Sequence, residues 1–226
     1  MNKNEPILIA CEESGVVTSA FIKRGFTNVF SCDLNETTGC YSNRHIVGDV
    51  MPIINGKCSF KTSDGINHKI DTEFSLIIAF PPCTHLAVSG ARHFAEKQKD
   101  GRQQDGIDFF MEFVNCKCEK VAIENPIGIM STKYKNPTQI IQPYYFGDAE
   151  VKTTCLWLKN LPMLIHIKEE NLFNEKITHV TPEYIIGKRT LKKYSRIHYE
   201  TPSRDRSRIR SKTFNGIANA MAEQWG

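Results

Sequence analysis

Long apolar runs and a secretory leader are both missing from this sequence of 226 residues. No stretch approaches the ~20 consecutive apolar residues that a helix needs to cross a bilayer. The first residues, Met-Asn-Lys-Asn-Glu-Pro, contain no apolar segment of the kind that a signal peptide carries. We therefore expect a cytoplasmic protein with no membrane partner.

Internal repeats, low-complexity segments and paired cysteine motifs are missing as well. The cysteines are Cys11, Cys32, Cys40, Cys58, Cys83, Cys116, Cys118 and Cys155. A chain of this length buries a full core without disulfides, so we expect free thiols in a reducing compartment. Cys116 and Cys118 are separated by one residue, and no second pair follows at the spacing of a zinc knuckle. The sequence therefore predicts no metal site.

Acidic residues are scarce near the C-terminal end of the sequence. Residues 188–226 contain ten Lys/Arg and three Asp/Glu, whereas the whole chain has 29 and 25. Clustered positive charge on a near-neutral body favours contact with phosphates, and the alternative is a solvated basic segment without a partner. Four arginines occupy every second position, at Arg204, Arg206, Arg208 and Arg210. In an extended chain they would share one face, which could follow a phosphate backbone.

The rest of the sequence, with 40% apolar and 24% charged residues, has the composition of a globular domain. Short apolar segments that end at polar residues predict buried parallel strands at 7–10, 28–32, 45–47, 75–80, 120–123 and 154–158. Other patterns predict helices at 16–24, 105–114, 137–142 and 218–225, and a hairpin with an Asp-Gly turn within 56–70. Loops and short strands are expected over 159–212. This alternation predicts an α/β fold, with a mostly parallel sheet and helices on both faces.

Polar residues follow five of the predicted strands, at Glu12, Asp33, Asp49, Cys83 and Glu124. The carboxyl ends of parallel strands meet at one edge of a sheet, where ligands bind, so we expect these side chains to share a pocket. Asp33 is suited to accept hydrogen bonds from ribose hydroxyls, and Asp49 from an adenine amino group. The alternatives are a helix cap for Asp33 and an exposed turn for Asp49. The pattern favours a ligand that contains a nucleoside.

The turn after the first predicted strand reads Glu12-Glu13-Ser14-Gly15 and leads into a helix. A glycine here allows the backbone to approach a ligand, and the helix N-terminus favours a negative group. The full Gly-x-Gly-x-x-Gly pattern of dinucleotide sites is missing, so this turn alone is a weak signal.

The segment Phe80-Pro81-Pro82-Cys83 is the strongest local signal in the chain. Two prolines form a rigid corner after a buried strand and hold Cys83 at the mouth of the sheet. A partly exposed thiol near a helix N-terminus or a positive charge has a lowered pKa, so we expect a nucleophile. Glu124 should lie nearby and could hydrogen-bond a heterocycle nitrogen and transfer a proton. The alternatives are an inert buried cysteine and a capping or ion-paired glutamate.

In this order, the residues resemble the cytosine-C5 DNA methyltransferase family, and most closely its short members from bacteriophages and prophages. The family has a glycine turn after strand one, acids after strands two and three, Pro-Pro-Cys and Glu-Asn-Val, the last of which reads Glu124-Asn125-Pro126 here. Residues 88–92 and 216–222 resemble its polar-glycine segment and its closing helix. Residues 145–154 resemble its Gly-x-Pro-Gln-x-Arg-x-Arg segment, with Lys152 and Thr154 in place of the arginines. The resemblance implies a Rossmann-like fold that uses S-adenosylmethionine.

The resemblance also implies a role for each matching residue. Cys83 would attack C6 of cytosine, and Glu124 would hydrogen-bond or protonate N3 while C5 accepts the methyl group. The implied cofactor contacts are Glu12, Ser14, Gly15, Asp33, Leu34, Asp49, Val50, Pro81 and Asn219. The implied nucleic-acid contacts are Ser89, Arg92, Lys152, Arg204, Arg206, Arg208 and Arg210, with His93 beside Arg92.

The chain departs from the family in two places. The first motif reads Cys11-Glu12-Glu13-Ser14-Gly15 instead of Phe-x-Gly-x-Gly, so the cofactor turn must differ in detail. Only about 50 residues separate the 154–158 strand from Phe214, too few for the usual target-recognition domain. We therefore expect a catalytic core at 1–158, a reduced basic segment resembling a target-recognition domain at 159–212, and a C-terminal helix at 213–226 that returns to the core.

The expected activity is that of a DNA (cytosine-5-)-methyltransferase, acting as a monomer or homodimer, in the host cytoplasm if a phage encodes it. At the level of the family, the role would be in restriction–modification. One alternative keeps the chemistry but uses RNA, single-stranded DNA or a free cytosine nucleotide, which the short recognition segment favours and the basic tail opposes. Another is a catalytically silent nucleic-acid-binding protein on the same fold, which only the altered glycine turn supports.

Overall fold

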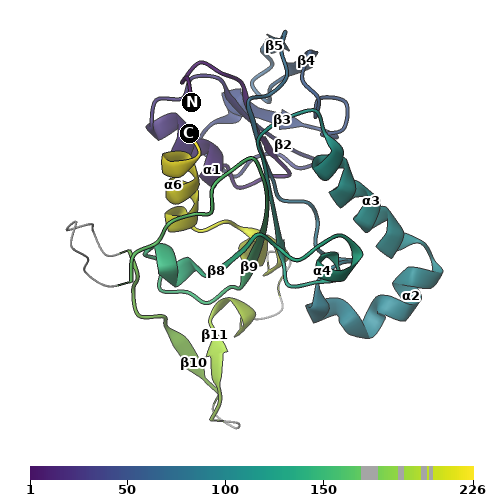
Figure 1. The fold of residues 1–226 in the computed structure, drawn as a ribbon, viewed down its shortest axis with the longest axis vertical. Helices are drawn as coiled ribbons and strands as arrows, with labels where there is room; N and C mark the ends of the chain where they lie inside the picture. The colour runs from purple at the N-terminus through teal and green to yellow at the C-terminus, as the bar shows by residue number, and fades with distance from the viewer. Residues whose placement is uncertain (169–177, 188–190, 200–202, 204–205) are drawn as a thin grey trace.

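The structure, a computed structural model, describes residues 1–168, 178–187, 191–199, 203 and 206–226 (Figure 1). Its central sheet consists of β1 (Ile7–Ala10), β2 (Val29–Asp33), β3 (His45–Val47), β6 (Leu76–Ala79), β7 (Val121–Pro126), β8 (Gln139–Ile141) and β9 (Thr154–Lys159). The strand order is β3-β2-β1-β6-β7-β9-β8. Strands β3, β2, β1, β6 and β7 run parallel to one another, and β9 runs antiparallel to both of its neighbours, β7 and β8.

This order places a topological switch point between β1 and β6. From β1 the chain builds outward through β2 and β3, then crosses to the other side of β1 to form β6 and β7. The loops at the carboxyl ends of β1 and β6 therefore diverge, which opens a crevice where ligands bind in sheets of this kind. The predicted α/β fold is confirmed as a Rossmann-like, mostly parallel sheet.

Helices cover both faces of the sheet because the strands are apolar on both sides. Ile7 and Ile9 face α1 (Val16–Lys23) and α6 (Asn215–Gln224), while Leu8 and Ala10 face the core that contains α3 (Arg102–Asn115). In Figure 1, α1 and α6 lie on one side of the sheet and α3 lies on the other. The two termini lie side by side, and the Met1 amino group donates to the Gly226 carbonyl at 3.3 Å.

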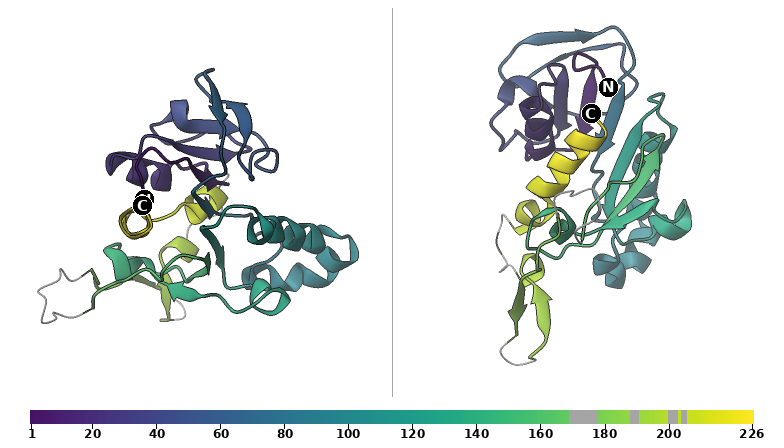
Figure 2. Two further views of the ribbon diagram at one scale, coloured as in Figure 1. Left: turned by 45° about the horizontal axis from the view of Figure 1, so that its top comes forward. Right: turned by 60° about the vertical axis from the view of Figure 1, so that its left-hand side comes forward.

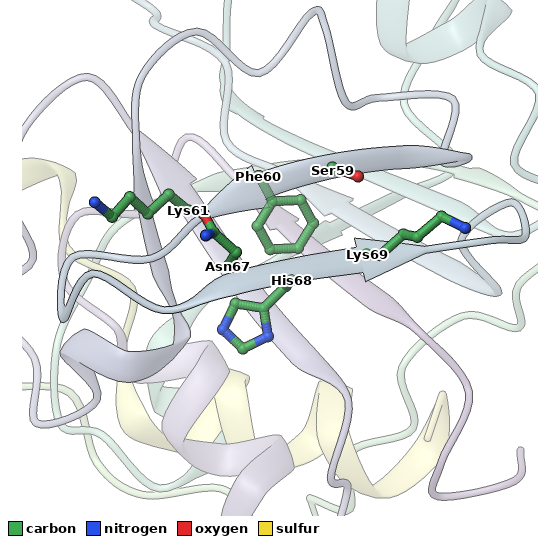
Figure 3. A pocket seen from close by; sticks show the side chains of 6 residues that line it. All are labelled: Ser59, Phe60, Lys61, Asn67, His68 and Lys69. Carbon is green, nitrogen blue, oxygen red and sulfur yellow. The ribbon is translucent and has the colours of Figure 1, made fainter.

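Shorter elements decorate the edges of this core. They are α2 (Phe94–Lys99), α4 (Met130–Lys133), α5 (Arg206–Ser211) and the 3₁₀ turns η1 (Ser42–Arg44), η2 (Val88–His93), η3 (Pro143–Phe146) and η4 (Ile197–Tyr199). Two hairpins complete the fold, β4 (Cys58–Lys61) with β5 (Asn67–Ile70), and β10 (Tyr184–Ile186) with β11 (Lys193–Ser195). The hairpin predicted within 56–70 is thus confirmed, and its strands line a cavity of about 380 Å³ (Figure 3). Within the described ranges, no helix is long and apolar enough to cross a membrane.

Three local predictions are wrong. The strand at 154–158, predicted to be parallel, is β9 and runs antiparallel to β7 and β8, because a connection without an α-helix returns it beside β8. The helix expected at 137–142 is instead β8, because β9 offers a free edge for backbone pairing and the Gln139 side chain bonds both backbone groups of Leu164. The arginines expected on an extended chain lie on α5, where every second residue turns by ~200°. Arg208 therefore points away from Arg206 and Arg210, and the three do not form one row. Arg204 lies outside the described residues.

Candidate active site

The corner that presents Cys83 is tied to the neighbouring strand by one buried hydrogen bond. The Asn125 side-chain amide donates to the Pro81 carbonyl at 2.8 Å. After the corner, the backbone N–H groups of Leu86 and Ala87 donate to the Cys83 carbonyl at 3.0 and 2.9 Å, which closes a turn. The half-buried Cys83 is therefore fixed relative to β7, the strand that carries Glu124.

The pKa of the Cys83 thiol is raised, so the expected lowering is wrong as a net effect. Burial is the largest cause, and the negative charge of Glu124 raises the pKa further. Two cations, Lys152 and Arg210, act in the opposite direction but do not outweigh the loss of solvent. The expected positive charges are present, while the thiol is less solvated than the sequence suggested.

Burial also raises the pKa of the Glu124 carboxyl. Lys152 opposes this shift, and so does Thr154, whose hydroxyl hydrogen-bonds the carboxyl. A carboxyl with a raised pKa holds its proton to higher pH than an exposed one, and can donate a hydrogen bond there. Cys83, Glu124 and Lys152 thus form one electrostatically coupled group at the carboxyl ends of β6 and β7.

Helix α5 lies between this group and the turn after β1. At its C-terminal end, the Lys152 ammonium donates to the carbonyls of Ser211 and Lys212 at 3.3 and 3.5 Å. From the middle of the helix, an Arg208 Nη1 atom lies 3.9 Å from Glu13 Oε1. The basic helix therefore contacts both halves of the crevice at the switch point.

Glu12 is used by the fold itself. Its buried carboxylate accepts the backbone N–H groups of Val17 and Thr18 at 2.6 and 3.2 Å and the Thr18 hydroxyl at 2.6 Å. Burial nevertheless raises the pKa of Glu12 to about 7. This carboxylate stabilises the first turn of α1, where free N–H groups need acceptors.

Gly15 closes the same turn in a left-handed conformation, with φ of 62°. A Cβ at this position would lie 3.3 Å from the Gly39 Cα atom, so the loop after β2 packs against the turn. Thr38 N–H donates to the Glu13 carbonyl at 3.0 Å across the same contact. The turn has a defined shape even though it lacks the usual glycine pattern.

The acids after β2 and β3 converge on the end of β1. The pKa of the Cys11 thiol is raised far above its ordinary range, by burial first and then by the charges of Asp33, Cys32 and Asp49. Asp33 Oδ1 accepts the Asn35 N–H at 2.9 Å, and Asp49 Oδ1 accepts the Met51 N–H at 3.0 Å. Both predicted carboxylates therefore lie near enough to the end of β1 for their charges to act on Cys11.

Apolar side chains accompany these carboxylates. Leu34, directly after Asp33, is 76% exposed, and Val50, directly after Asp49, is buried in the core. Two carboxylates for hydroxyl and amino groups, with an exposed aliphatic side chain beside them, match the chemistry of a nucleoside. The residues present therefore fit the adenosyl part of S-adenosylmethionine.

The remaining predicted site residues lie on several different elements. Ser89 and Arg92 are exposed on η2, where the Arg92 Nε–H donates to His93 Nε2 at 2.9 Å. Asn219 is exposed on α6, Pro81 is buried in the corner, and Ser14 is half-buried in the first turn. The described contacts do not join Ser89, Arg92 or Asn219 to Cys83 or Asp33, so their roles stay predictions.

Three residues of the site were not singled out from the sequence. Thr154 acts on the Glu124 carboxyl, Asn125 bonds the Pro81 carbonyl at the Cys83 corner, and Cys11 is affected by the charges of Asp33 and Asp49. Thr154 was visible only as a substitution for a family arginine. Because β9 pairs with β7 in antiparallel register, Thr154 reaches Glu124 through a contact that local sequence patterns do not encode.

Comparison with known proteins finds likenesses among solved structures only. No family model and no curated protein matches the chain. A solved E. coli protein encoded within a prophage, described as a candidate DNA modification methyltransferase, is similar with 16% identity and a TM-score of 0.46. The match covers 79% of this chain and 53% of that protein, so the chain spans about half of its length. The fold assignment therefore rests on the strand order and orientation described above.

Proposed function

We propose that this chain is an S-adenosylmethionine-dependent DNA methyltransferase that modifies C5 of cytosine. The observation that carries the proposal is the buried bond from Asn125 to Pro81, which fixes a Pro-Pro-Cys corner against a Glu-Asn strand end. Cys83 and Glu124 are close enough for the charge of one to shift the pKa of the other. A thiol and a proton-holding carboxyl in this relation suit covalent addition to a heterocycle.

Each residue of the coupled group has a separate task in this chemistry. The Cys83 thiolate bonds to C6 of the base. After methyl transfer, water takes the C5 proton, the C5–H electron pair restores the ring double bond, and the C6–S bond breaks to release the thiolate. The Glu124 carboxyl holds a proton at N3, which allows the ring to accept the electron pair. The Lys152 ammonium stabilises the thiolate and also lowers the pKa of Glu124, so that Glu124 can release its proton again. S-adenosylmethionine, when bound, supplies the methyl group that becomes attached to C5.

The cofactor would bind at the carboxyl ends of β1, β2 and β3. Asp33 accepts hydrogen bonds from ribose hydroxyls, and Asp49 accepts one from the adenine amino group. Leu34, which is exposed, would supply apolar contact with the adenine ring, and the buried Val50 would support the site from below. The turn at 12–15 approaches the remainder of the cofactor with its backbone, since the Glu12 carboxylate is already committed to α1.

The nucleic acid would approach from the side of α5. Arg206 and Arg210 are half-buried and Arg208 is exposed on this helix. Arg210 acts on the pKa of Cys83, so the helix brings positive charge to the catalytic thiol itself. Because a base inside a duplex cannot reach such a thiol, the target cytosine must be flipped out of the DNA duplex.

The test is transfer of tritium from labelled S-adenosylmethionine to duplex DNA, single-stranded DNA, RNA and dCMP, with nucleoside analysis of the product. We expect 5-methylcytosine in duplex DNA, complete loss with Cys83→Ala, and no change with Cys58→Ala. Cys58 is a matched control because it is also a partly buried thiol but lies on the β4–β5 hairpin. Label in another base, or transfer that survives Cys83→Ala, would contradict the proposal. Cofactor binding without transfer to DNA would favour another substrate, and no cofactor binding would favour a silent scaffold.

A further inference from the structure

The N-terminus of α1 is occupied by a carboxylate of the chain itself. The backbone N–H groups of Val17 and Thr18 donate to the buried Glu12 side chain. The first N–H groups of a helix that follows a strand are a common binding site for the anionic group of a ligand. S-adenosylmethionine has such a group at its amino-acid end, where a carboxylate stands beside an ammonium. The charges that recognise this end must therefore come from another part of the chain.

Glu13, the next residue, is held in the turn by its backbone. Its carbonyl accepts the Thr37 hydroxyl at 2.9 Å and the Thr38 N–H at 3.0 Å, both from the loop after β2. Its side chain is 20% exposed. Because β1 lies between β2 and β6 in the sheet, the turn that carries Glu13 lies between the strand ends of Asp33 and Cys83. The Glu13 carboxylate is thus between the adenosyl site and the catalytic thiol.

A cation from α5 faces this carboxylate. Arg208 Nη1 lies 3.9 Å from Glu13 Oε1, and 51% of the Arg208 side chain is exposed. This separation exceeds the ~2.7–2.9 Å of a charge-assisted hydrogen bond, so the two groups attract one another without a direct bond between these atoms. In the left-hand view of Figure 2, α5 lies between the purple N-terminal half of the sheet and the teal and green second half. The two opposite charges therefore meet within the crevice at the switch point.

We propose that Glu13 and Arg208 bind the amino-acid end of S-adenosylmethionine, with the Arg208 guanidinium on its carboxylate and the Glu13 carboxylate on its ammonium. This inference rests on the proposed function, because it takes that cofactor as given. A carboxylate and a guanidinium that face one another match the two opposite charges of an α-amino acid. The forked guanidinium can also donate two parallel hydrogen bonds to a carboxylate. With Asp33 at the ribose, the cofactor is held at both ends.

The assignment divides the arginines of α5 between two tasks. Every second residue of a helix turns by ~200°, so Arg208 points away from Arg206 and Arg210. Arg210 brings positive charge to Cys83, whereas Arg208 brings it to the turn after β1. Recognition of the cofactor thus depends on a side chain from the C-terminal part of the sequence, in addition to the strand ends of the first half.

The test measures the affinity of three ligands that share one scaffold. S-adenosylhomocysteine, its decarboxy analogue and its deamino analogue are titrated calorimetrically into the wild-type protein, Arg208→Met, Arg208→Lys and Glu13→Gln. Arg24→Met and Glu223→Gln are matched controls, because they remove the two charges of another arginine–glutamate pair, which is exposed and joins the end of α1 to α6. Circular dichroism establishes that all the proteins are folded.

We expect Arg208→Met to bind S-adenosylhomocysteine about tenfold or more weakly, and to bind the decarboxy analogue at least as well as the wild-type protein does. Glu13→Gln should lose affinity for S-adenosylhomocysteine and retain it for the deamino analogue. Arg208→Lys should lose less than Arg208→Met, since lysine keeps the charge but not the fork. Both controls should match the wild-type protein with every ligand. Equal losses for all three ligands in Arg208→Met, or no loss with any of them, would overturn the inference.

Measurements on the wild-type protein separate this inference from the proposed function. Cofactor binding and methyl transfer that are unchanged in Arg208→Met and Glu13→Gln would overturn the inference and leave the chemistry intact. The expected pattern of affinities without methyl transfer to any substrate would support the cofactor site and contradict the proposed activity. Absence of binding by S-adenosylmethionine and by all three ligands would overturn both.

Titration of a short fluorescent DNA duplex decides between the two tasks for Arg208. We expect Arg208→Met to retain the duplex affinity more fully than Arg210→Met, which removes a charge from the side of Cys83. Weaker duplex binding by Arg208→Met, together with unchanged affinity for all three ligands, would overturn the inference and place Arg208 at the nucleic acid.

Discussion

The Asn125 amide donates a buried hydrogen bond of 2.8 Å to the Pro81 carbonyl, which joins the strand of Glu124 to the corner of Cys83. Proline cannot offer an N–H at this corner, so its carbonyl is the group through which the neighbouring strand can hold it. The Glu-Asn and Pro-Pro-Cys segments are therefore parts of one structure, in which Asn125 fixes the position of the corner that carries Cys83.

This bond predicts the effect of Asn125→Ala. The buried Pro81 carbonyl would lose its partner, so we expect the free energy of unfolding to fall by ~1–3 kcal/mol. Methyl transfer should fall further than the folded fraction does, because Cys83 is no longer held in place. Urea unfolding and transfer assays measure the two effects. Asn28→Ala is the control, since it removes an exposed amide-to-carbonyl bond at 3.3 Å, and it should cost ~0.5 kcal/mol or less. Equal costs for the two variants would contradict this account.

The charges around Cys83 predict how its reactivity depends on pH. Alkylation by iodoacetamide, followed by peptide mapping, reports the thiolate fraction of this residue. The midpoint should lie above the ~8.5 of a free cysteine, because burial and Glu124 raise the pKa. Lys152→Met should move the midpoint upward and Glu124→Gln should move it downward. Lys61→Met on the distant hairpin should not move it. A midpoint that ignores Lys152→Met would show that Lys152 does not act on the thiol.

The buried carboxyl of Glu12 predicts a pH dependence of stability. Its pKa is about 7 in the folded protein, against ~4.3 for an exposed glutamate. Between these values the folded state holds a proton that the unfolded state has released, so the free energy of unfolding falls as pH rises. The total loss is at most ~4 kcal/mol. Urea unfolding between pH 4 and pH 8 measures it.

Glu12→Gln should remove most of this dependence, while Glu36→Gln, at an exposed position, should retain it. Glu12→Gln also replaces an acceptor of two backbone N–H groups by an amide oxygen, which can still accept one of them. If the wild-type protein gained stability between pH 5 and pH 7 where the variant did not, the assigned direction of the pKa shift would be wrong.

The position of Asp33 predicts a role in cofactor affinity. A hydrogen bond to a charged group contributes ~1.5–3 kcal/mol, so Asp33→Ala should weaken S-adenosylmethionine binding about tenfold to a hundredfold. Calorimetric titration measures the affinity, and thermal unfolding reports any loss caused by the Asn35 bond. Asp71→Ala, which removes an exposed carboxylate paired with Lys69, should bind the cofactor normally. Unchanged affinity in Asp33→Ala would remove this residue from the site.

The sequence by itself determined the class of fold and the edge where the site lies. Apolar segments that end at Asp33, Asp49, Cys83 and Glu124 are local signals, and in a parallel sheet every strand that runs the same way ends at the same edge. Once the strands were recognised, the convergence of these residues followed. Two short segments, β8 and α5, were assigned to the wrong secondary structure, since a few residues do not have enough local preference to resist a neighbouring strand edge or a docking surface. The antiparallel direction of β9 was also missed, because strand direction depends on pairing with β7 and β8 and not on local sequence.

Only the tertiary structure decided the contacts and charges within the site. The insertion of β9 between β7 and β8 brings Thr154 to Glu124, and the docking of α5 brings Arg210 to Cys83 and two carbonyls to Lys152. The direction of the Cys83 pKa shift also needed the fold. Desolvation is a sum over neighbours from distant parts of the chain, and no pattern of adjacent residues contains that sum.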